Sequence, residues 1–195
     1  MVTRKYELKQ RARSQEETRQ RIVDATVALH NSIGPARTTI SAIAERAGVQ
    51  RLTVYRHFPD ERSLFRACGG QWMVEYPLPD PARWAEEPEP ERRLQLALGE
   101  IYTYFRATEE MTANLRRDLP ELPVLQEVAG PYVAYWASVR VVLEQGWKLR
   151  GPRKARLHAV IGHAVEFETW RSLARGQRLG DVEAAELMVR LARAV

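Results

Sequence analysis

The strongest constraint on the fold is one segment, residues 38–64, which reads TTISAIAERAGVQRLTVYRHFPDERSL. Two threonines stand before a short run whose apolar residues recur every three or four positions, and threonine is a favoured residue at the start of a helix. Gly48 then interrupts the run, because glycine readily adopts the left-handed backbone that ends a helix. A second run extends from Gln50 to Phe58 and stops at Pro59. The spacing predicts two short helices joined by a tight turn, which is the helix-turn-helix arrangement.

The rest of the chain also has the apolar spacing of helices. Five stripes keep intervals of three or four residues, which places their side chains on one helix face. They are Ile22, Ala25, Leu29 and Ile33; Leu94, Leu98, Ile101 and Phe105; Val133, Trp136, Val139 (or Arg140) and Leu143; Val160, Ala164, Phe167 and Trp170; and Ala184, Leu187, Leu191 and Val195. Alternating strand patterns between turn signals are missing. We therefore predict an all-α fold of roughly nine helices, the last two at about 153–176 and 181–195.

A proline-rich segment divides the chain. Five of the eleven prolines fall between Pro77 and Pro90, a density that we expect to exclude helices and central strands. The charge balance changes at the same place, because residues 1–75 hold 13 Lys and Arg against 8 Asp and Glu, whereas residues 76–195 hold 17 of each. A basic part joined to a neutral part suggests a polyanion-binding module on a partner domain. We predict a basic N-terminal arm at 1–17, a helix-turn-helix domain at 18–76 and a second helical domain at 77–195.

The N-terminal arm leaves two alternatives open. Its cations are Arg4, Lys5, Lys9, Arg11 and Arg13, with Glu7 alone among them, and Glu16 and Glu17 follow. Such an arm reaches along phosphates or into a minor groove, or it is a disordered tail.

Several classes of protein are not expected from this composition. No run of eighteen apolar residues predicts a membrane-spanning helix, and no apolar run follows the N-terminal charges as in a secretory signal. Cys68 alone forms no internal disulfide, so we expect a cytoplasmic protein. His158, His163 and Glu166 do not share one helix face, and no catalytic motif is present. We therefore predict no enzyme activity, no metal and no cofactor.

The outer positions of the second short helix have the chemistry of a DNA-reading surface. They are Gln50, Arg51, Leu52, Thr53, Tyr55, Arg56 and His57, which carry several hydrogen-bond donors and no acidic group. Phosphates and base edges are rich in acceptors, so such a helix suits the major groove. An ordinary helical hairpin with polar outer faces is the alternative.

Over roughly residues 18–70 the chain resembles the DNA-binding domain of the TetR (tetracycline-repressor-like) transcriptional regulators. The matching residues are Ala44, Ala47, Gly48, Val49, Thr53, Tyr55, His57 and Phe58. The resemblance implies that Thr39 caps the first short helix and touches phosphate, and that Ser41 reaches a base or phosphate. It implies groove-facing roles for Arg51, Leu52, Thr53 and Arg56, and phosphate contacts for Tyr55 and His57. The chain departs from the family at two positions. The family often has a small residue or proline at the position of Leu52, and a lysine at the position of Glu61.

The resemblance also implies that the remaining helices hold an effector pocket and a dimer interface. Aromatic and polar candidates for the pocket, which equally suit an ordinary core, are Tyr102, Phe105, Met111, Asn114, Tyr132, Trp136, His163, Phe167 and Trp170. Interface candidates are Val160, Ala164, Ala184, Leu187, Leu191 and Val195. We predict a homodimer that binds a palindromic double-stranded operator and is released by a small molecule. The alternatives are an all-α binding protein or enzyme without DNA specificity, an activator, and a ligand-blind regulator.

Overall fold

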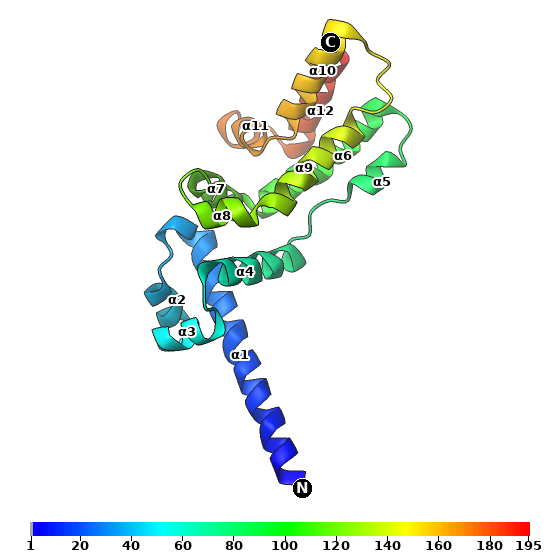
Figure 1. Cartoon of the computed structure of the whole chain (residues 1–195). Helices are drawn as coiled ribbons and strands as arrows, with labels where there is room; N and C mark the ends of the chain where they lie inside the picture. Colours follow the sequence, from blue (N-terminus) through cyan, green and yellow to red (C-terminus); the bar gives the residue numbers. More distant parts are fainter. Residues whose placement is uncertain (1) are drawn as a thin grey trace. The chain divides into compact units, whose positions relative to one another are not determined.

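The computed structural model describes residues 2–195, with side chains at residue 6 and from residue 8 onward, and the chain forms two compact units. The first unit comprises the chain up to Pro77 together with Glu110–Ala129, and the second comprises Leu78–Glu109 and Gly130–Val195. Helices make up the regular structure throughout the described residues, which contain no strand (Figure 1). The all-α prediction is therefore confirmed. None of the described helices combines the length and the hydrophobicity needed to cross a membrane.

The described residues form twelve α-helices instead of the predicted nine or so. Three of them, α5 (Pro81–Ala85), α8 (Pro123–Val128) and α11 (Phe167–Arg171), have only five or six residues. Helices of that length are too short to display a repeated apolar stripe, so periodicity does not reveal them. Helix α5 also corrects the expectation that the proline-rich segment excludes helices. Pro81 begins this helix, where the missing N–H would have had no intrahelical partner.

In the first unit, α1 (Val2–Ser32) is the helix against which α2 (Ile40–Ala47) and α4 (Glu61–Glu75) pack. Helix α3 (Arg51–His57) packs on α2, and α8 packs on α4. A 3₁₀ turn, Pro35–Arg37, links α1 to α2. The buried core consists of Ile22, Val23, Ala25, Val27, Ile43, Ala44, Ala47, Val54, Phe58, Leu64, Cys68 and Met111. This core fixes the two short helices relative to α1.

Helix α7 (Glu109–Asp118) supplies polar groups that complete the C-terminal end of α1. Asn114 Nδ2 donates to the carbonyl oxygens of His30 (3.2 Å) and Asn31 (2.6 Å). Arg117 Nη2 donates to the carbonyl oxygen of Ile33 at 3.0 Å. Asp118 Oδ2 accepts the backbone N–H of the 3₁₀ turn at 3.0 Å. Because the last carbonyls of a helix have no intrahelical partner, α7 satisfies groups that the N-terminal segment cannot satisfy alone.

Gly34 ends α1 in a conformation that other residues rarely adopt, with φ 92° and ψ 158°. A Cβ at this position would lie 2.1 Å from Arg117 Nη2 and 2.5 Å from Asp118 Oδ2. We expect Gly34→Ala to destabilise the first unit by about 2–3 kcal/mol, through backbone strain and displacement of the Arg117–Asp118 pair. Thermal unfolding followed by circular dichroism measures this loss.

Gly69→Ala is the matched control for that substitution. Gly69 lies in α4 with no atom within 4 Å of the added Cβ, so alanine is expected to leave stability unchanged or raise it by about 0.5–1 kcal/mol. Equal melting temperatures for the two alanine variants would contradict the prediction that a Cβ at Gly34 destabilises the first unit.

In the second unit, α12 (Asp181–Arg193) packs on α6 (Pro90–Ala107) and α10 (Gly151–Ala164), and α9 (Gly130–Leu143) contacts α5 and α6. The predicted single helix at 153–176 is wrong, because α10 ends at Ala164 and is followed by α11 and a π-helical turn, Ser172–Gly176.

Buried Arg93 donates to backbone carbonyls of Val142 (3.1 Å) and Gln145 (2.8 Å) and to two carbonyls before α6. It thereby ties the start of α6 to the end of α9.

Candidate nucleic-acid interface

Helix α2 begins as the sequence predicted. Thr39 has extended backbone angles, and its Oγ1 accepts the backbone N–H of Ala42 at 3.1 Å. Ile43 and Ala44 face the core, whereas Ser41 is exposed on the outer side of the first turn. The Thr39 hydroxyl is also exposed, so its hydrogen remains available to an external acceptor.

The turn between α2 and α3 depends on Gly48. Its φ of 65° and ψ of 40° are left-handed, and its N–H donates to the carbonyls of Ala44 and Glu45. The N–H of Val49 also donates to Ala44 O at 2.9 Å, while its half-buried side chain packs on the core. These bonds satisfy the C-terminal end of α2 and set the direction in which α3 starts.

Helix α3 has one face fixed and one face free. Val54 is fully buried, and Phe58, which caps the helix, is 3% exposed. The exposed side chains are Gln50, Arg51, Leu52, Tyr55 and Arg56, while Thr53 and His57 are half-buried. Leu52 is 76% exposed, an unusual position for so large an apolar side chain. No acidic residue lies in α3, so its free face presents donors, cations and one apolar group.

His57 is placed differently from a freely solvated histidine. Its Nε2 is buried and has no hydrogen-bond partner among the residues that the structure describes, which leaves Nδ1 for any external contact. Burial, followed by the charges of Arg56 and Arg19, lowers the pKa of His57 below its ordinary value. The Arg19 guanidinium lies over the Phe58 ring, 4.4 Å from its centroid, so α1 borders the end of α3.

Helix α4 begins beside this surface with Asp60 as its cap. Asp60 Oδ1 accepts the N–H of Ser63 at 2.6 Å, and the hydrogen bonds from Ser63 lower the pKa of Asp60. Glu61 is exposed, and Arg62 is ion-paired with Glu127 of α8. Arg62 is therefore engaged within the first unit instead of being presented to a partner.

The predicted effector residues do not form one cluster. Met111 is part of the core of the first unit, and Asn114 caps α1 there. Both residues were expected in a pocket with the aromatic side chains, whereas the structure engages them in the first unit. Residues 110–129 fold against α1 and α4, a long-range arrangement that helical spacing does not reveal.

The other predicted effector residues lie in the second unit, mostly as a packed aromatic cluster. Phe105 is its centre, with ring centroids 5.5 Å from Trp136, 5.4 Å from Phe167 and 6.0 Å from Trp170. Tyr102 is buried and donates to Ala164 O at 2.9 Å. Outside the buried core, half-buried Tyr132 packs on Trp136, and exposed His163 contacts Thr169 with its Nδ1 3.1 Å from Oγ1.

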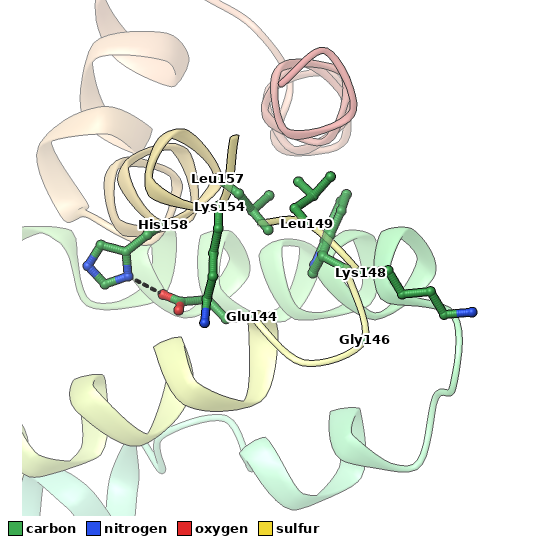
Figure 2. A pocket seen from close by; sticks show the side chains of 8 residues that line it. Glu144, Gly146, Lys148, Leu149, Lys154, Leu157 and His158 are labelled. Carbon is green, nitrogen blue, oxygen red and sulfur yellow. Dashed lines mark hydrogen bonds and ion pairs between the residues drawn. The ribbon is translucent and has the colours of Figure 1, made fainter. Parts of the chain in front are cut away.

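A cavity of about 180 Å³ lies elsewhere in the second unit, between the start of α10 and the connection from α9 (Figure 2). Figure 2 shows His158 and Glu144 meeting across it, with Nδ1 and Oε1 2.6 Å apart. The remaining lining residues are Gly146, Trp147, Lys148, Leu149, Lys154 and Leu157. None of the nine predicted effector residues lines this cavity.

The predicted interface residues fall into two groups. Leu187 and Leu191 are 38% and 45% exposed on α12, one helical turn apart, and Val160 and Val195 are half-buried. In contrast, Ala164 and Ala184 are fully buried within the second unit. Their prediction as contact residues is wrong, because their methyl groups already pack inside the protomer. The exposed leucines remain available for a partner.

Comparisons with known proteins agree with this geometry. Residues 22–68 match the family model described as "Bacterial regulatory proteins, tetR family". The HTH-type transcriptional regulator AcrR of Shigella flexneri is 42% identical over 50 residues, which are 26% of this chain and 23% of that protein. The chain thus spans less than a quarter of the curated relative that it matches.

Solved structures show the same fold over nearly the whole chain. A TetR-like transcriptional regulator from Rhodococcus sp. RHA1 has a TM-score of 0.61 at 22% identity, covering 90% of this chain and 93% of that one. NalD, the secondary repressor of the MexAB-OprM multidrug efflux pump in Pseudomonas aeruginosa, has a TM-score of 0.60 at 23% identity, covering 93% and 96%. At these identities the likeness establishes the fold.

Proposed function

Because the chain belongs to the TetR family of bacterial regulatory proteins through its residues 22–68, we propose that it represses transcription by binding a palindromic operator as a homodimer. The observation that carries this proposal is the free face of α3, where donors and cations surround Leu52 while Val54 anchors the opposite face. A helix with these properties fits the major groove. In a binding protein or enzyme without DNA specificity, an exposed leucine surrounded by donors and cations on one helix face would have no function.

Each exposed group has a task in the proposed complex. Arg51 and Arg56 are the base readers, since a guanidinium donates two hydrogen bonds to guanine. Leu52 contacts a thymine methyl group, which uses its large exposed apolar surface. The hydroxyls of Thr39, Ser41 and Tyr55 and the free ring nitrogen of His57 donate to phosphates. Gln50 and Thr53 complete the surface with further donors.

A homodimer follows from the small size of this surface. A helix of seven residues reads only a few base pairs, so two symmetric copies are needed for a specific site. We propose that α10 and α12 pair with their copies as a four-helix bundle, with Leu187 and Leu191 at its centre and Val160 and Val195 at its edges. The fully buried alanines of these helices support the bundle from inside the protomer.

Release by a small molecule is also part of the proposal. NalD represses a multidrug efflux pump, which suits a ligand-released repressor in this fold. We propose that an apolar effector enters the aromatic cluster around Phe105 from the side of half-buried Tyr132 and Trp136, with His163 as a polar contact. Repacking of this cluster would change the separation of the two DNA-reading surfaces. An apolar compound that binds the second unit and lowers operator affinity supports this step.

Selection of binding sites from random duplex DNA tests the function directly. The expected result is a palindromic sequence whose half-sites lie about one helical turn of DNA, or a multiple of it, apart. Specific binding should weaken as salt rises, with a log–log slope of about −0.9 for each phosphate neutralised. No enriched sequence, together with a slope near zero, would favour the binding protein or enzyme instead.

Substitutions in α3 separate base readers from phosphate contacts. Arg51→Ala and Arg56→Ala should each relax the preference at one symmetric position, at about 1–3 kcal/mol for a bidentate contact to guanine. Tyr55→Phe should instead weaken binding to every sequence, because phosphate contacts carry no base information. Repeated selection with each variant measures the difference. Arg66→Ala, an exposed change on α4, is the control, and unchanged preferences in both arginine variants would remove them from base reading.

A further inference from the structure

Helix α1 is far longer than its packing requires. Its first buried residue is Ile22, and every described side chain from residue 8 to 17 is exposed. Arg19 lies over Phe58 at the end of α3, so the helix leaves the core at the edge of the proposed DNA-binding surface. The sixteen residues from Val2 to Glu17 then rise about 24 Å, and Figure 1 shows α1 continuing past α2 and α3.

The charge of this extension is positive. Residues 2–17 contain five Lys and Arg against Glu7, Glu16 and Glu17, and the two adjacent glutamates stand at its inner end, although Arg4, Lys5 and Glu7 lie outside the described side chains. Lys9 and Arg13 are four residues apart and share one helix face, whereas Arg11 lies on the opposite side. Arg13 pairs with Glu17 at 2.9 Å, but both groups are exposed, and such a pair contributes little. The extension therefore presents cations on two opposite sides.

The extension lacks the features needed for other partners. Its large apolar residues are Val2, Tyr6 and Leu8, which stand near its outer end, and the sequence from residue 9 to 17, KQRARSQEE, has none. A helix that docks in a protein groove or lies on a membrane needs a continuous apolar stripe. A basic helix without such a stripe suits a polyanion, whose phosphates lie on both sides of a groove.

We infer that residues 2–17 form a second DNA-contacting element, which binds phosphates flanking the base pairs read by α3. The inference rests on the proposed function, since it requires α3 to be on DNA. Because an isolated helix of this length is marginally stable in water, contact with DNA also stabilises the extension. Its contacts add affinity and length to the interface without adding sequence preference.

The test uses the full chain with Lys9→Gln, Arg11→Gln and Arg13→Gln combined. Glutamine is a good helix former, so the helix is expected to persist, and circular dichroism checks this. The control combines Arg83→Gln, Arg92→Gln and Arg171→Gln, which removes the same number of charges from exposed positions of the second unit outside α10 and α12. Salt titration, hydroxyl-radical footprinting and binding-site selection are measured for the wild type and both variants.

Loss of the flanking contacts predicts a specific pattern. The salt slope of the first variant should fall by about 0.9 for each lost contact, and thus by up to about 2.7 for each protomer. Its footprint should shorten at the outer edges, while the selected sequence stays that of the wild type. A slope and footprint equal to those of the control would overturn the inference alone. Wild-type protein without any sequence preference would instead overturn the proposed function, and the inference with it.

Discussion

Replacing Leu187 and Leu191 with glutamate is expected to separate the homodimer and to lower operator affinity about a hundredfold or more. Both side chains are exposed on one face of α12, and two carboxylates buried against a second copy would lack partners. A monomer offers one α3 to a two-half-site operator, so most of the specific binding energy is lost. Sedimentation velocity followed by gel-shift titration measures both effects.

The control for this variant is Val133→Glu with Val141→Glu. These valines are 62% and 63% exposed on α9, so the same charge is added to the second unit away from α12. Truncation of α12 is a poorer experiment, because Met188 and several alanines of this helix are part of the core. If the Leu187/Leu191 variant remains dimeric, the dimer interface lies elsewhere. If it is a monomer with undiminished operator affinity, the proposal that two copies of α3 bind one operator is rejected.

Acid is expected to weaken the first unit by up to about 3 kcal/mol between pH 6.5 and pH 4. Burial lowers the pKa of His30 to about 4 and outweighs the opposing effect of the Asp118 charge. The ring is 3% exposed, packs on Phe65 and lies with its Nδ1 3.4 Å from Cys68 Sγ. Since the unfolded chain binds this proton near pH 6.5 and the folded chain does not, stability is full above that pH and falls as the pH is lowered.

Urea unfolding at several pH values measures this dependence. In a His30→Phe variant the slope of unfolding free energy against pH should become clearly shallower between pH 6.5 and pH 4. This holds whether the substitution raises or lowers the absolute stability. Some slope remains from His57 and, near pH 4, from Asp60 and Asp118, whose pKa values are also lowered. His158→Phe changes an exposed histidine of the second unit and is the control. Identical pH dependence of wild type and His30→Phe would show that His30 does not control acid stability.

Local chemistry made the DNA-binding segment predictable from the sequence. Thr39 caps α2 and Gly48 is left-handed because both roles depend on residues within one helical turn. The alternation of Val54 with outward polar residues likewise fixed which face of α3 would be free. The individual contacts of that face with DNA stay predictions.

Long-range packing explains most of what the sequence did not reveal. Met111 and Asn114 join the first unit because residues 110–129 return to α1, and nothing near them in sequence marks that return. The break after Ala164 lacks a glycine or proline, so apolar spacing continued through it. Aromatic content could not separate pocket from core either, and Phe105, Phe167 and Trp170 are fully packed.

The return of residues 110–129 to α1 has a consequence for exchanging parts between regulators of this fold. A transplant cut at Pro77 would carry α1 without Met111 in its core and without Asn114 on its terminal carbonyls. The transferable module is therefore two separate stretches of chain, and a chimera must take both from the same parent. Among related regulators, substitutions in residues 110–129 are expected to accompany substitutions in the N-terminal part of the first unit, which these residues complete. Their neighbours in sequence on both sides belong to the other unit.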